Sequence, residues 1–98
     1  MYIFWYISVD WILLEQKTEC GGEEINVGRF YEVSQCAEKC RSISSMFVFG
    51  TNEYGLTKCD ESGCKCFCET ESTNVGTCQT KDSMGYNLYT YVKPPSGK

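Results

Sequence analysis

The sequences CAEKC at residues 36–40 and GCKCFCE at residues 63–69 decide the fold of this chain. A helix places Cys36 and Cys40 on one face about 6 Å apart, because four residues rise by that length along its axis. A strand places alternate cysteines on one face, about 6.6 Å apart. Because the two spacings match, two disulfides can hold a helix against a strand with little strain. The sequence therefore predicts a helix clamped covalently to a sheet.

Eight cysteines in 98 residues are typical of a small disulfide-rich domain from an oxidising compartment. A chain of this size buries only about 60–65% of its unfolded surface, so covalent cross-links matter for its stability. A zinc or thiolate cluster is the alternative, but the sequence has no histidine and no Cys-x-x-Cys pair. We therefore expect a secreted, extracellular protein with four disulfides, formed by Cys20, Cys36, Cys40, Cys59, Cys64, Cys66, Cys68 and Cys78.

The net charge of −4 and the absence of histidine exclude several function classes. Nucleic acids and anionic membranes require clustered Lys and Arg, and histidine is the usual general base and a common metal ligand. Carboxylates suited to calcium occur at Glu23–Glu24, Asp60–Glu61, Glu69 and Glu71. They lack the spacing of a calcium loop, and acidic pairs in loops are usually just solvated. We therefore expect no enzyme activity, cofactor, metal or nucleic-acid partner.

Turn residues and apolar alternation predict the other elements. Ser34 is a suitable N-cap for a helix that ends near Ser44–Ser45, and strands are expected at residues 29–33, 46–49, 63–69, 77–79 and 86–92. Tyr86, Tyr89 and Tyr91 are candidate ligand contacts, although aromatic residues in a closing strand more often pack in a core. The expected fold class is α+β: a small disulfide-stapled antiparallel sheet cradling one helix, with a long N-terminal strand extension.

Residues 33–91 resemble a PAN/apple-type module in four motifs: VSQCAEKC, MFVFG, GCKCFCE and GYNLYTY. The resemblance implies a curved sheet around one helix, with Cys36 and Cys40 bonded to two of the three strand cysteines Cys64, Cys66 and Cys68. It also implies adhesion or recognition of proteins and carbohydrates outside the cell, without catalysis. The chain departs from the family pattern at Ser45-Met46, where many such modules have a cysteine. It also carries a third cysteine in the strand and an additional one at Cys59.

Eight cysteines allow 105 pairings, and the sequence alone does not choose among them. If the helix runs antiparallel to the cysteine-rich strand, we expect the nested pairs Cys36–Cys68 and Cys40–Cys66. The remaining four cysteines still allow three pairings, and our hypothesis among these is Cys20–Cys78 with Cys59–Cys64.

Residues 2–14, YIFWYISVDWILL, are apolar except for Ser8 and Asp10. A membrane-spanning helix needs about 20 such residues, so no transmembrane span is expected here. The polar exceptions share the even face, and this period of two predicts a β-strand. Its apolar odd face is formed by Ile3, Trp5, Ile7, Val9, Trp11 and Leu13. A leader remnant and an ordinary internal strand are the alternatives.

The expected strand is longer than the domain it would join. Thirteen extended residues span about 43 Å, whereas the remaining body should be about 30 Å across, and an exposed strand edge is a template for another chain. We expect an extension and hinge at 1–19, a PAN/apple-like domain at 20–93 and a tail at 94–98. The expected function is a non-catalytic structural or adhesion module that assembles with copies of itself into filaments or oligomers by strand donation, and that can also bind an extracellular protein or glycan. The alternatives are a secreted monomeric effector (toxin, inhibitor or defence peptide) and a lectin-like binding module.

Overall fold

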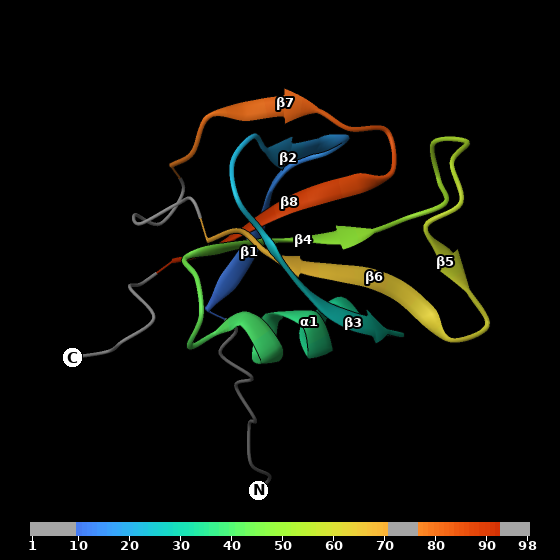
Figure 1. Ribbon diagram of the computed structural model, residues 1–98, viewed down its shortest axis with the longest axis horizontal. Coiled ribbons are helices and arrows are strands. Elements are labelled where there is room, and N and C mark those ends of the chain that lie inside the picture. The colour runs from blue at the N-terminus through green and yellow to red at the C-terminus, as the bar shows by residue number, and fades with distance from the viewer. Residues whose placement is uncertain (1–9, 71–76, 93–98) are drawn as a thin grey trace, which may run out of the picture.

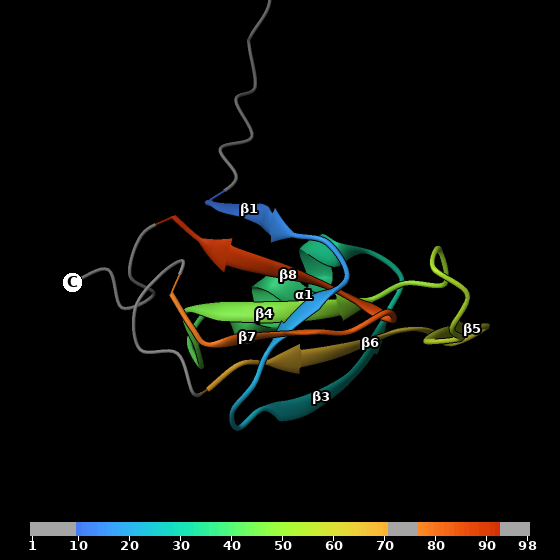
Figure 2. The same ribbon diagram turned by 90° about the horizontal axis from the view of Figure 1, so that it is seen from above.

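The computed structural model describes residues 10–70 and 77–92, which form an antiparallel sheet covered on both faces. Its strand order is β1-β8-β4-β6-β3, with β5 paired to the start of β6, and Figure 2 shows the strands in this order. A second, two-stranded sheet pairs β2 with β7. The elements are β1 (Trp11–Glu15), β2 (Thr18–Cys20), β3 (Ile25–Phe30), α1 (Val33–Cys40), β4 (Met46–Gly50), β5 (Cys59–Asp60), β6 (Gly63–Cys68), β7 (Thr80–Asp82) and β8 (Tyr86–Tyr91). The α+β class predicted from the sequence is confirmed.

Two hydrophobic clusters lie on opposite faces of the main sheet. In Figure 1 the helix α1 covers one face, and the β2–β7 pair lies on the other side of the sheet. The cluster under α1 contains Cys36, Ala37, Cys40, Phe47, Phe49, Cys66, Cys68 and Tyr91. The cluster toward β2 and β7 contains Cys20, Met46, Val48, Tyr86 and Leu88. The strand β4 is buried along its whole length because its alternate side chains enter both clusters, which explains its unbroken apolar sequence MFVFG.

The helix begins two residues earlier than the sequence suggested. Its N-cap is Glu32, not Ser34, and it ends at Cys40 rather than near residue 44. The side-chain oxygen of Gln35 accepts hydrogen bonds from the main-chain N–H groups of Tyr31 at 3.0 Å and Glu32 at 2.9 Å. These bonds satisfy donors that the start of a helix leaves unpaired.

All eight cysteines are disulfide-bonded, as expected. The pairs Cys20–Cys78 and Cys59–Cys64 are those anticipated from the sequence. The clamp between helix and strand is also present, but its nested pairing was wrong, because the bonds are Cys36–Cys66 and Cys40–Cys68.

The direction of the helix explains the pairing. β3 is antiparallel to β6, and the chain reverses at residues 31–32 before entering α1. The helix therefore runs in the same direction as β6, as Figure 1 shows, and cysteines pair in the same order on both elements.

Two strands lie at other residues than predicted, and two short strands were not foreseen. β3 spans Ile25–Phe30 rather than 29–33, and β7 spans Thr80–Asp82 rather than 77–79. β3 is half-exposed with a register shift between Asn26 and Gly28, so its sequence shows no clean alternation. β2 and β5 are two or three residues long, which is too short for a periodic signal.

Candidate functional site

The edge strand β1 carries the most contiguous exposed apolar surface in the described residues. β1 pairs with β8 on one side, and within the described residues no strand pairs with its other side. Three consecutive aliphatic side chains on it are 41–49% exposed: Ile12, Leu13 and Leu14. The pairing with β8 shifts register between Leu13 and Glu15, so Leu14 sits in a bulge. Since a bulge disrupts regular pairing, the regular part of the free edge consists of Trp11, Ile12 and Leu13.

The start of β1 is anchored to its own domain. The guanidinium of Arg41, just after α1, donates a hydrogen bond to the carboxylate of Asp10 and forms an ion pair with it. The same guanidinium lies 5.5 Å from the centre of the Tyr91 ring. Trp11 is half-buried and packs edge-on against Phe47 and Tyr89, with ring centroids 6.2 and 5.8 Å away. Residues from Asp10 onward therefore belong to the domain.

This anchoring corrects the expected hinge at residues 15–19. Glu15 ends β1, and Thr18 and Cys20 are buried in β2. The Oγ1 of Thr18 donates a hydrogen bond to the main-chain oxygen of Gln16 at 2.7 Å. The segment therefore connects the two sheets: Glu15 belongs to the main sheet, and Thr18 and Glu19 pair with β7 in the second sheet.

The predicted apolar odd face is only partly described. Ile3, Trp5, Ile7 and Val9 lie outside the described residues. Trp11 faces the core, as predicted, but Leu13 is 46% exposed. The helix α1 packs mainly against β3, β4 and β6, away from the β1 edge of the sheet, and Leu13 therefore stays exposed.

The tyrosines proposed as ligand contacts are mainly core residues. Tyr86 is 8% exposed and Tyr91 is 1% exposed. The hydroxyl of Tyr91 donates a hydrogen bond to the main-chain oxygen of Ala37 in α1. Tyr89 is half-buried and stacks on Phe47 with ring centroids 5.1 Å apart. Packing in the core, the interpretation that the sequence favoured, therefore describes this strand.

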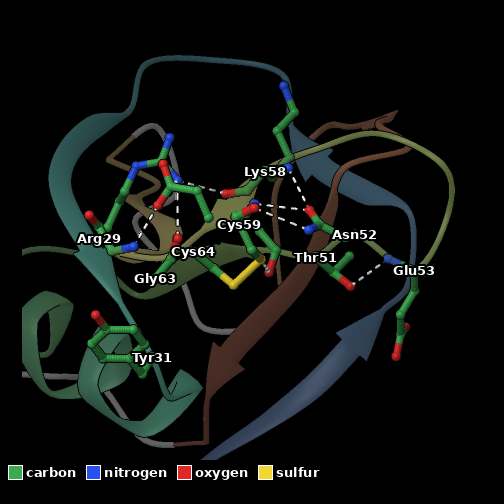
Figure 3. Close-up of a disulfide and its surroundings, with 12 residues drawn as sticks. Arg29, Tyr31, Thr51, Asn52, Glu53, Lys58, Cys59, Gly63 and Cys64 are labelled. Carbon is green, nitrogen blue, oxygen red and sulfur yellow. Dashed lines mark hydrogen bonds and ion pairs between the residues drawn. A yellow bond between two sulfur atoms is a disulfide. The ribbon is translucent and has the colours of Figure 1, made fainter.

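A second exposed feature is the lobe of residues 51–62, which contains β5. Figures 1 and 2 show β5 at one end of the molecule, beyond the main sheet. The side-chain oxygen of Asn52 accepts hydrogen bonds from the N–H groups of Lys58 and Cys59 at 2.7 and 2.9 Å. Arg29 donates to the main-chain oxygens of Lys58 and Gly63 at 3.1 and 3.0 Å. Figure 3 shows these hydrogen bonds around the Cys59–Cys64 disulfide. The hydrogen bonds and the disulfide together fix the conformation of the lobe.

One aromatic side chain from the turn between β3 and α1 contacts this lobe, and one aliphatic side chain of the lobe itself is exposed to solvent. Tyr31 is 67% exposed, and its hydroxyl donates to the main-chain oxygen of Glu61 at 2.6 Å. Leu56 is 46% exposed. Asp60, one of the carboxylates considered for calcium and not expected to bind it, lies 3.6 Å from a guanidinium nitrogen of Arg29.

Three carboxylates meet at the other end of the sheet. Carboxylate oxygens of Glu19, Glu24 and Glu69 lie within 4.8 Å of one another. Glu69 is completely buried, and neither of its carboxylate oxygens accepts a hydrogen bond from the described residues. Glu19 is half-buried on β2, and Glu24 is exposed in the loop before β3.

Burial and neighbouring charge both disfavour the ionised form of Glu69. Burial is the larger cause, and the carboxylates of Glu24 and Glu19 add to it, so the pKa of Glu69 is raised to about 8. The N–H of Cys20 lowers this pKa, although it forms no hydrogen bond of normal geometry with Glu69. The pKa of Glu24 is raised by partial burial and by Glu19.

Sequence reasoning missed several of these residues. The sequence has no motif that predicts the exposure of four apolar side chains, because their exposure depends on which elements cover them: Ile12, Leu14, Tyr31 and Leu56. Glu24 and Glu69 were named from the sequence among the carboxylates suited to calcium, but they were set aside because they lack the spacing of a calcium loop. The burial of Glu69 also had a detectable signal. Glu69 lies two residues after the partly buried Phe67, so strand alternation directs it toward the same apolar face.

Comparisons with models of protein families, with curated proteins and with solved structures find no match to this chain. Within residues 10–70 and 77–92, no helix has the length and hydrophobicity required to cross a membrane.

Proposed function

We propose that this protein is a non-catalytic extracellular structural module of PAN/apple type that associates with copies of itself through the free edge of β1. The observation that carries the proposal is the row of exposed side chains Ile12, Leu13 and Leu14 on an edge strand. Unpaired edge strands with apolar side chains are templates for pairing with another chain.

The rest of the chain supports this function in two ways. Four disulfides suit an oxidising compartment and make a stable building block. The sequence that precedes Asp10 is also apolar, although its residues lie outside the part of the chain that the structure describes. Donation of a strand from a swinging hinge is not part of this proposal, because Asp10 and Trp11 are held by their own domain.

Self-association is tested by the mass of the oxidised protein in solution. Analytical ultracentrifugation over a range of concentrations should give species larger than the 11.2 kDa monomer. Substitution Leu13→Lys should weaken association by tenfold or more, because burying a charged side chain in place of leucine costs more than about 1.4 kcal/mol.

The chain offers a matched control for this variant. Leu56 has the same 46% exposure as Leu13 but lies on the lobe around β5. Leu56→Lys should therefore leave the mass distribution unchanged. A monomer at all concentrations, or equal effects of the two variants, would contradict the proposal.

Recognition of a protein or glycan by a monomer is the second candidate function. It is favoured by the lobe of residues 51–62, where the exposed ring of Tyr31 is oriented by its bond to Glu61. Aromatic side chains of this kind anchor partners in many interfaces. The same ultracentrifugation experiment separates the two functions, because this one requires no self-association.

A further inference from the structure

We propose that Glu19, Glu24 and Glu69 form a calcium-binding site. The three residues come from β2, from the loop between β2 and β3, and from the position directly after β6. Their carboxylate oxygens lie within 4.8 Å of one another. Glu69 has 0% exposure and both of its oxygens lack a hydrogen-bond donor in the described residues.

A cation accounts for the unpartnered carboxylate of Glu69. Burying a carboxylate without a partner costs several kcal/mol, so buried carboxylates in proteins are normally hydrogen-bonded, paired or bound to a metal. Lys81 lies opposite Glu19 in the β2–β7 ladder and lowers the pKa of Glu24. The single positive charge of Lys81 does not balance three negative carboxylates. A divalent cation carries two positive charges and balances them better.

The ligand chemistry and spacing favour calcium. Calcium binds oxygen ligands at about 2.3–2.6 Å in flexible geometry, so two of its ligands lie at most about 5 Å apart, as these oxygens do. Thiolates do not compete, because all cysteines are disulfide-bonded. The exposure of Glu24 leaves access for the ion and for the water molecules that complete its coordination.

Disulfides hold two of the three ligands in place. Glu69 follows Cys68, which is bonded to Cys40 of the helix, and its N–H donates to the oxygen of Met46 at 2.9 Å. Glu19 precedes Cys20, which is bonded to Cys78. Binding therefore has to order only the loop side chain of Glu24, which limits its entropic cost.

Isothermal titration of the oxidised, full-length protein with calcium chloride tests the site, after removal of metals with a chelator. We expect a single site with a dissociation constant of about 10⁻⁴–10⁻³ M, the range of extracellular calcium modules. Glu24→Gln should weaken binding at least tenfold. Glu24 is exposed, so this variant tests the ligand without disturbing the core. Glu69→Gln should abolish binding.

Glu53→Gln is the matched control, because Glu53 is an exposed glutamate in the lobe of residues 51–62, and we expect it to bind calcium like the wild type. Absence of binding up to 10⁻² M calcium would overturn the site. Unchanged affinity of Glu24→Gln, or equal responses to calcium chloride and magnesium chloride, would indicate general screening of negative charge and would also overturn it.

Discussion

Glu69 occupies a position that strand alternation assigns to an apolar side chain. Phe67 precedes it by two residues and packs beside the buried cluster of Met46 and Tyr86. Tyr91 is buried too, but its hydroxyl has a partner in the main-chain oxygen of Ala37. Glu69 has no such partner in the described residues, so its protonation state is coupled to folding.

In calcium-free buffer, the free energy of unfolding should fall between pH 4.5 and pH 8. Glu69 has an ordinary pKa of 4.5 in the unfolded chain and a pKa of about 8 in the folded protein, so the folded state binds an extra proton in this window. The resulting stabilisation is complete below pH 4.5 and is lost as the pH rises through 8. The charged groups that face Glu69 are Glu19 and Glu24, and Lys81 lies near Glu24. The pKa of Glu24 is also raised, so its titration lowers the free energy of unfolding in the same direction.

Denaturant unfolding at a series of pH values measures this effect. Glu69→Gln should remove most of the decline, because an amide does not titrate, while Glu53→Gln should keep it. A wild-type stability that increases with pH across the same window would contradict the prediction.

At the scale of the elements, the clamp between α1 and β6 joins the helix to the centre of the sheet. Cys36–Cys66 and Cys40–Cys68 close segments of 30 and 28 residues and are buried completely. Cys59–Cys64 closes a segment of only 5 residues at the edge of the molecule. A cross-link restricts the unfolded chain more when it closes a longer loop.

Removing one clamp disulfide should therefore destabilise the protein more than removing the lobe disulfide. The double substitution Cys36→Ala with Cys66→Ala should cost about 3–4 kcal/mol, and Cys59→Ala with Cys64→Ala about 2 kcal/mol. Denaturant unfolding of the two double variants provides the comparison. Equal losses would mean that chain entropy does not dominate the contribution of these bonds.

At the scale of the whole molecule, two thin hydrophobic clusters share one sheet. Each contains only a few large side chains besides half-cystines, and a domain of this length has a total stability of about 5–15 kcal/mol. Four disulfides at about 2–4 kcal/mol each are comparable with that total. The native state consequently depends on its covalent cross-links.

Complete reduction should unfold the domain. Near-ultraviolet circular dichroism reports the packing of rings such as Trp11, Phe47 and Tyr89, and this signal should disappear in excess thiol. Reoxidation should restore it. A cooperative thermal transition that persists in reductant would show that the two clusters suffice without disulfides.

Local spacing in the sequence determined the α+β class, the helix at Cys36–Cys40 and the strands around Phe47, Cys66 and Tyr89. These features depend on the rise of a helix and the alternation of a strand, which are properties of neighbouring residues. The pairs Cys20–Cys78 and Cys59–Cys64 were also anticipated, once the clamp had used the other four cysteines.

Only the tertiary structure decided the order of the clamp disulfides, the anchoring of Asp10 to Arg41 and the meeting of Glu69 with Glu19 and Glu24. The first depends on the direction of α1 relative to β6, which follows from the long-range pairing of β3. The other two join residues far apart in the chain. Spacing along the chain carries no information about such contacts, because they arise when separate elements pack against a common sheet.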